Sequence, residues 1–81
     1  MLQKEIAKLM NEQVNKELYS SYLYLHIRNY YLNENLDGFA NWFYIQAQEE
    51  RDHAMLFMTY LQNNDEEVSL LPIDAPNIKF D

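Results

Sequence analysis

The sequence predicts an all-α fold: an antiparallel hairpin of two long helices that forms half of a four-helix bundle. Helix breakers are scarce, because Gly occurs once among 81 residues and both prolines lie among the last ten. Two long segments repeat apolar residues every three or four positions, which is the helical period. Only a few polar residues, Asn33 to Asn35, separate the segments, and such a short connection makes neighbouring helices antiparallel.

The first helix is expected over about residues 3–31. This stretch contains no Gly or Pro, and Leu, Glu, Lys, Gln and Met dominate its first half. Its face towards the bundle is expected to carry a mostly apolar stripe with a carboxylate near the centre: Ile6, Met10, Gln13, Glu17, Ser20 or Ser21, Tyr24, Ile27 and Tyr31. Tyr and Leu spread apolar surface over much of the remaining circumference, which indicates a helix buried on more than one side.

The second helix is expected over about residues 36–63, with an Asn of the connection as its N-cap and Asp37 in the first turn. Its inward stripe is also mostly apolar and is interrupted by an acid and a histidine: Phe39, Phe43, Gln46, Glu50, His53, Phe57 and Leu61. We expect the two stripes to face each other. Residues 64–81 are charged, contain both prolines and show no helical period, so they are interpreted as an extended tail.

The size of the chain predicts that it associates. A domain of about this length buries only about 60% of the surface that its unfolded chain exposes, so its own core is marginal. No cysteine is present to form a disulfide. The missing stability is therefore expected from bound metal or from other protein. We expect another chain, or a missing half of this one, to complete the four-helix bundle.

The charge of the chain narrows the classes of partner. The net charge of −7 argues against nucleic acid, whose phosphates need Lys and Arg. Cations fit better as partners, although solubility explains the charge equally well. The sequence has no apolar run of membrane-spanning or signal-peptide length and no cysteine, so we expect no membrane contact and a cytoplasmic location.

One group of side chains is suited to bind a metal ion. Glu50 and His53 form a Glu-x-x-His step, which places both side chains on one helix face about 60° apart. Glu17 on the antiparallel neighbour completes a carboxylate–carboxylate–imidazole set suited to iron, with Glu50 able to bridge two ions. A salt-bridge network is the competing explanation, but the nearest cation in sequence, Arg51, points about 100° away from Glu50. Because unpartnered buried carboxylates are costly, we favour a metal site.

Three further residues are candidates for a place at or near this site. His26 lies nine positions after Glu17, about 180° around the helix, so it is expected at the surface or an interface. Tyr24 lies two turns after Glu17 on the same side, where its hydroxyl fits either a bond to a liganding carboxylate or a plain core role. Glu49 points about 100° away from Glu50, and spacing alone favours a solvated side chain over a ligand of a neighbouring ion.

Three segments of the chain resemble motifs of the ferritins. They are residues 15–25 (NKELYSSYLYL), 38–43 (GFANWF) and 49–54 (EERDHA). The resemblance covers essentially all 81 residues and retains the spacing between the motifs. A rubrerythrin-like peroxidase shares the Glu-x-x-His step, but the match at residues 17–24 favours a ferritin. The chain thus resembles the N-terminal half of a non-haem, bacterial-type ferritin subunit, with two helices and the start of the long crossover.

The resemblance implies roles for the residues singled out above. Glu17, Glu50 and His53 are implied as ligands of the first iron of a ferroxidase centre, with Glu50 as the bridging carboxylate. Tyr24 is implied as the tyrosine beside that centre. Glu49 matches the acid that helps to hold a third iron in prokaryotic ferritins, so the resemblance reverses the interpretation drawn from spacing.

Two departures from relatives of that family are informative. Bacterioferritins place a haem-ligating Met directly after the bridging Glu, where this chain has Arg51, so no haem is expected. The chain also ends in the tail that resembles the crossover, so the remaining ligands of the second iron and the later helices are not in it.

The expected function is iron storage and detoxification. Fe(II) binds between the helices, O₂ or peroxide oxidises it, and Fe(III) is stored in a shell of identical subunits. One alternative is a self-pairing helical module without turnover, or a dimer that joins two symmetric Glu-Glu-His sets. Another is one part of a subunit whose remaining half supplies the other ligands.

Overall fold

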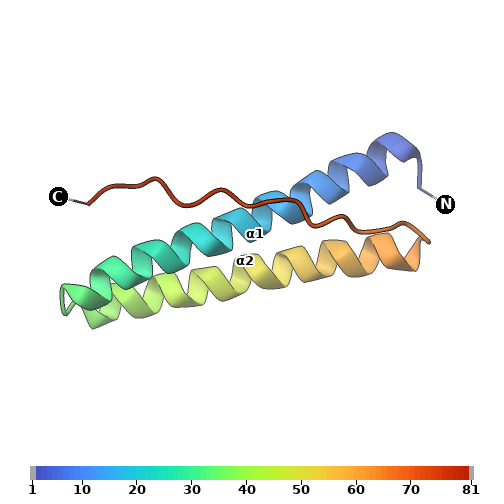
Figure 1. Cartoon of the computed structure of the whole chain (residues 1–81). Coiled ribbons are helices and arrows are strands. Elements are labelled where there is room, and N and C mark those ends of the chain that lie inside the picture. Colours follow the sequence, from blue (N-terminus) through green and yellow to red (C-terminus); the bar gives the residue numbers. More distant parts are fainter. Residues whose placement is uncertain (1, 81) are drawn as a thin grey trace.

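The computed structural model describes residues 2–80, which form two long helices, a tight turn and an extended tail (Figure 1). Helix α1 spans Lys4–Asn33 and helix α2 spans Asp37–Asn63. They run antiparallel along their whole length, and residues 2–80 contain no strand. The all-α hairpin is therefore confirmed, with helix ends within one or two residues of the predicted ones. Met1 and Asp81, the ends of the predicted domain, lie outside the described residues.

Both helices end in the same backbone motif. After α1, Asn35 takes a left-handed φ of 61°, its N–H bonds to the Leu32 carbonyl, and the Leu36 N–H bonds back to Tyr31. After α2, Asp65 takes φ of 60° and an equivalent pair of bonds follows. This is the Schellman motif, and Asn and Asp are the side chains that tolerate its left-handed position best after Gly. The connecting Asn35 therefore ends the first helix, and the prediction that an Asn of the connection caps the second helix is wrong, since Leu36 is at that position.

Mostly small side chains form the seam between the helices. The buried residues recur every seven positions on each helix: Ala7 and Val14 on α1, and Ala40, Ala47, Ala54 and Leu61 on α2. Ser21 continues the α1 series, and its hydroxyl donates a 2.7 Å hydrogen bond to the Ala47 carbonyl across the seam. A side-chain bond to a backbone carbonyl of the neighbouring helix requires the two backbones to approach closely.

The predicted inward stripes lie beside this seam. On α2 the stripe residue Leu61 is buried, but Phe39 remains 58% exposed. Glu50 lies about 40° around the helix from Ala54. The stripes therefore line one long open face next to the helix–helix contact. Only the residues at the edge of each stripe take part in that contact.

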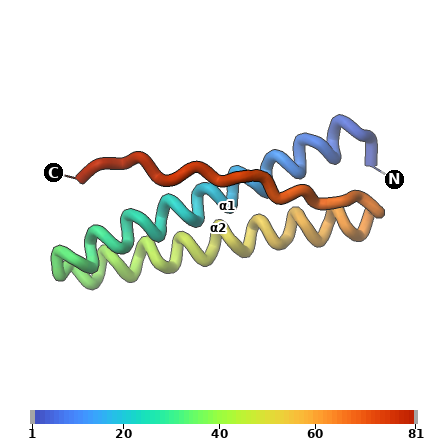
Figure 2. The backbone as a smooth tube through the Cα atoms, in the orientation of Figure 1, coloured from blue at the N-terminus to red at the C-terminus, as the bar shows by residue number. Residues whose placement is uncertain are grey.

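The tail from residue 64 to 80 has no helix or strand and returns along α1, in the same direction as that helix (Figures 1 and 2). Two asparagines hold it. Asn11 both donates to the Ser69 carbonyl and accepts from the Ser69 N–H, and Asn15 donates to Ser69 and accepts from Leu71. These bonds satisfy backbone groups of a segment that forms no ladder with another strand. The extended tail is thus fixed to one side of α1. Within residues 2–80, neither helix is long and apolar enough to cross a membrane.

Candidate metal centre

Glu17, Glu50 and His53 come together halfway along the hairpin. One possible ligand atom from each lies within 4.8 Å of the others. His53 Nδ1 is 3.8 Å from Glu17 Oε2 and 3.9 Å from Glu50 Oε1. The three side chains come from two helices, and the structure places them as the helical spacing predicts.

The small-residue seam explains why Glu17 reaches the other two groups. Ala47 and Ala54 lie three residues before and four residues after Glu50, on the side that contacts α1. The Ser21–Ala47 bond fixes the close approach one turn from Glu17. Larger side chains in the seam would separate the helices and move the carboxylates apart. The seven-residue Ala repeat is the sequence signal for this contact, which the apolar stripes alone do not reveal.

The two carboxyl groups interact directly. A hydrogen bond with Glu50 lowers the pKa of Glu17, against burial, which acts in the opposite direction. The same bond raises the pKa of Glu50, and burial and the neighbouring charge of Glu17 add to the rise. Below the raised pKa of Glu50 the metal-free pair therefore shares a proton, because two adjacent carboxylates repel each other. A divalent cation between them would replace that proton.

Gln13 orients the first carboxylate. Its side-chain amide donates a 3.0 Å hydrogen bond to Glu17 Oε1 from one turn earlier on α1. This bond leaves the other oxygen, Oε2, towards His53. Gln13 lies on the same stripe as Glu17, and its role was not predicted, although a Gln four residues before a carboxylate is a known helical pairing.

The centre is accessible from the open face. The side chain of His53 is 52% exposed, whereas Glu17 and Glu50 are 16% and 21% exposed. A cavity of about 450 Å³ reaches Glu17 and His53 and is otherwise lined by Met10, Leu56, Phe57 and Tyr60. Three ligands with open space beside them suit a metal ion that exchanges and reacts, because a structural site is closed by four protein ligands.

Three other predicted residues lie around this group. Tyr24 is half-buried and its ring packs 6.0 Å from that of Phe43. Glu49 is exposed next to Glu50, and its charge contributes to the raised pKa of that group. His26 lies away from the centre, beneath the tail, with Nε2 3.1 Å from the Ile78 carbonyl. Its exclusion from the site agrees with its place on the opposite side of α1.

Comparison with known proteins places this geometry in a family. The ferritin-like domain profile matches residues 7–81. The bacterial non-heme ferritin of Campylobacter jejuni is 41% identical over 80 residues, which cover 99% of this chain and 48% of that protein. A bacterial non-heme ferritin of Staphylococcus epidermidis is 38% identical with the same coverage. The chain thus spans about half the length of these relatives.

Solved structures agree with the sequence matches. An open-pore ferritin from the hyperthermophilic archaeon Archaeoglobus fulgidus superposes with a TM-score of 0.93 at 33% identity, over 100% of this chain and 50% of that one. A closed form engineered from the same organism's ferritin gives a TM-score of 0.94 at 33% identity, over 100% and 49%. The hairpin thus matches half of a ferritin chain in fold, and the chain belongs to the ferritin-like domain family.

Proposed function

We propose that this chain provides the iron-binding half of a ferritin-type ferroxidase centre and serves iron storage. The observation that carries the proposal is the convergence of Glu17, Glu50 and His53 within 4.8 Å on the open face of the hairpin. Family membership supports iron as the metal, since related proteins over the same residues are non-heme ferritins.

The donor set suits Fe(II) as a substrate. Two carboxylates balance the charge of one divalent ion, and the imidazole adds a neutral ligand that iron accepts well. Oxygen-rich ligation favours the ferric product, and the free positions towards the cavity admit the oxidant. Each Fe(II) gives one electron, so two irons reduce one O₂, with two protons, to hydrogen peroxide. Peroxide as oxidant would take two electrons and two protons to form water.

Each residue has a separate task in this proposal. Glu50 bridges towards a second iron, while Glu17 and His53 complete the first coordination shell. Gln13 holds the Glu17 carboxylate in position through its 3.0 Å bond. Glu49, exposed beside Glu50, holds a third ion on its way to or from the centre. Tyr24 lies on the same side of α1 as Glu17 and supports the centre from its place against the ring of Phe43. No haem takes part.

The remainder of the function depends on parts outside these residues. We propose that the second iron's other ligands come from protein that covers the open face, and that the assembled subunits enclose the ferric product in a shell. The net charge of −7 would help to concentrate cations around such a particle.

Anaerobic addition of Fe(II), followed by O₂ or peroxide, tests the proposal. Ferric absorbance is expected to rise rapidly in the original protein and to lose at least about tenfold in initial rate in Glu50→Ala, because a ligand is removed. Asp52→Ala is the matched control, since Asp52 is an exposed acid on the same helix. Equal rates for Glu50→Ala and the original protein would refute the proposal.

Glu49→Ala separates the third ion from the first. We expect it to retain the rapid initial oxidation but to bind less iron per chain before oxidant is added. A Glu49→Ala protein with the defect of Glu50→Ala would place Glu49 among the primary ligands instead.

A further inference from the structure

The hairpin exposes more surface than a chain of its size normally leaves to water. Its accessible surface is 6162 Å². A compact monomer of 9.8 kDa would expose about 5,200 Å² by surface scaling, so the excess is about 1,000 Å². That excess is close to the roughly 800 Å² that each partner contributes to a specific protein–protein interface.

Apolar side chains flank the metal centre at both ends of the open face. Towards the turn, Phe39 and Trp42 are 58% and 55% exposed. Towards the opposite end, Leu9, Leu56 and Tyr60 are 63%, 70% and 49% exposed. Large apolar side chains that gather on one exposed face are typical of a protein–protein interaction surface.

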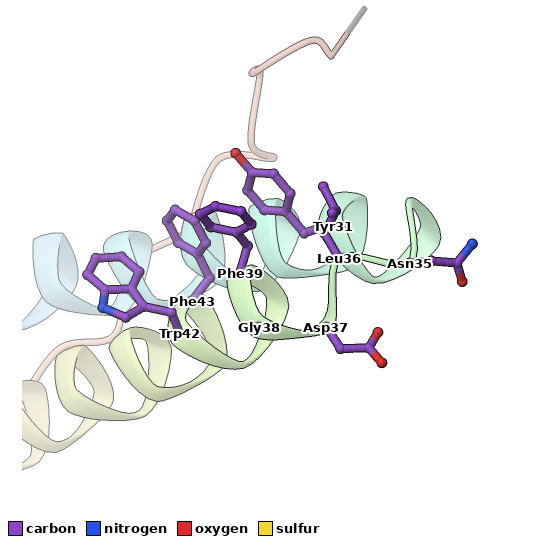
Figure 3. Close-up of a pocket in the computed structure, with 8 residues that line it drawn as sticks. All are labelled: Tyr31, Asn35, Leu36, Asp37, Gly38, Phe39, Trp42 and Phe43. Atoms are coloured by element: carbon purple, nitrogen blue, oxygen red, sulfur yellow. The ribbon is translucent and has the colours of Figure 1, made fainter.

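The turn end of this face is already ordered. Figure 3 shows the rings of Tyr31, Phe39, Trp42 and Phe43 gathered on one side of the turn. Tyr31 stacks on Phe39 and Phe43 at 5.3 and 5.6 Å, and Trp42 meets Phe43 edge-on at 4.9 Å. A groove of about 800 Å³ runs along them. A partner binding here would meet a preorganised surface and lose little side-chain entropy.

The centre lies at the midpoint of both helices. Glu17 is the 14th of the 30 residues of α1, and Glu50 is the 14th of the 27 residues of α2. A two-fold axis through the centre therefore overlaps two hairpins along nearly their full length. An off-centre site would leave one end of each hairpin uncovered. Symmetric pairing and a shared site are thus compatible in this chain.

We propose that the open face binds a second copy of this chain across a two-fold axis at the level of Glu50, so that two Glu17–Glu50–His53 sets build one two-metal site. Di-iron carboxylate bundles, of which ferritin-like proteins are themselves the type example, use a Glu from each of two helices and Glu-x-x-His from each of the other two. Two copies of this hairpin supply that inventory. The inference rests on the metal-binding part of the proposed function and not on oxidation.

Charge makes this pairing dependent on metal. Two copies bring four carboxylates together, Glu17 and Glu50 from each, and their repulsion opposes association. Two divalent cations carry the equal and opposite charge. Because the cations bind the pair better than the single hairpin, they stabilise the pair by mass action.

The test uses the 81-residue chain and Co(II), a divalent probe that air does not oxidise in such a site and whose absorption reports its ligands. Sedimentation equilibrium is expected to give the mass of two chains with Co(II), at one Co(II) per chain. Removal of Co(II) by a chelator is expected to shift the mass towards one chain. A single-chain mass with Co(II) bound overturns the proposal, as does a particle of more than two chains. The single-chain result is expected if a segment of a longer protein is the occupant.

Matched variants locate the interface. Phe39, 58% exposed, lies about 20° around α2 from Glu50, whereas Tyr44, 42% exposed, lies about 120° away. Phe39→Glu is expected to weaken pairing at least tenfold, and Tyr44→Glu to leave it unchanged. Trp42→Glu repeats the test should Phe39→Glu lose its helical circular dichroism. Equal pairing of all three variants with the original chain overturns the proposal.

The outcomes also separate this inference from the proposed function. A chain that pairs and binds Co(II) but does not oxidise Fe(II) contradicts ferroxidase activity and leaves the pairing intact. A chain that oxidises Fe(II) rapidly as a single hairpin supports the activity and contradicts the shared site.

Discussion

The two long faces of the hairpin are packed in opposite ways. The seam between α1 and α2 is made mostly of small residues, and its buried residues are at most 9% exposed. The adjacent open face carries large aromatic and aliphatic side chains, and Phe39, Trp42 and Leu56 are more than half exposed. The difference teaches that small residues set the distance between the helices, and with it the geometry of the candidate metal centre. The large residues provide the area over which other protein can cover that centre.

The largest effect is expected from filling the seam. Ala47→Leu adds a bulky side chain at a position that is 2% exposed and bonded to Ser21 through its carbonyl. Overpacking of this kind is expected to lower the free energy of unfolding by about 3 kcal/mol, the upper end of the usual range. Urea unfolding followed by circular dichroism measures it. Gln48→Leu, at the exposed neighbouring position, is expected to stay within about 0.5 kcal/mol. Similar losses in both variants would show that the seam is not tightly packed.

The second-largest loss of stability is expected at the turn that connects the two helices. Asn35→Val places a β-branched residue at φ of 61° and is expected to cost about 1–2 kcal/mol. Asn35→Gly is the control, because Gly takes this conformation without a steric penalty and is expected to match or exceed the original stability. Thermal unfolding midpoints compare the three proteins. If Asn35→Val is as stable as Asn35→Gly, the left-handed residue does not determine the turn.

A smaller effect, with a definite sign in pH, is expected at the centre of the open face. The raised pKa of Glu50 gives a stabilisation that is fully present below the ordinary glutamate value and is lost as pH rises through the raised pKa. The lowered pKa of Glu17 gives a stabilisation that is present above the ordinary value and is lost as pH falls through the lowered pKa. The metal-free chain is therefore expected to be most stable between the two values and weaker at neutral pH.

Glu50→Gln tests this pH dependence. Glutamine keeps a hydrogen-bond donor for Glu17 but carries no charge, so the loss of stability towards neutral pH is expected to disappear. Urea midpoints across the acidic to neutral range, in the presence of a chelator, are the measurement. Asp52→Asn is expected to retain the original dependence, since Asp52 is exposed. An unchanged curve for Glu50→Gln would mean that the two carboxyl groups do not share a proton.

The smallest effect on folding is expected from Gln13, although metal binding should respond. Gln13→Leu removes the bond to Glu17 Oε1 at a partly exposed position, so stability changes little. Loss of a residue that orients a ligand typically weakens metal affinity about 10- to 100-fold. Co(II) titration measures this, with Gln48→Leu as the control of equal chemistry. If the Gln13→Leu and Gln48→Leu proteins bind Co(II) with the same affinity, Gln13 does not orient a ligand of the centre.

The fold and the candidate ligands were predicted from the sequence because both follow from helical periodicity. No Gly or Pro occurs before Gly38, which predicts a long first helix. The three-residue step from Glu50 to His53 lies within one helix, where spacing alone sets the direction of each side chain. Features that join two segments were not predicted. The Ser21–Ala47 bond and the hold of Asn11 and Asn15 on the tail each link residues at least 26 positions apart.

The sequence by itself determined two long helices, their antiparallel order and one side of each helix that carries the acids. Only the tertiary structure decided that Ala40, Ala47 and Ala54 form the contact, while the acid-bearing stripes remain on the open face. The physical reason is that apolar periodicity marks every surface that avoids water and does not distinguish a contact within the chain from one with another protein. Close backbone approach at small side chains makes that distinction, and it depends on both helices at once.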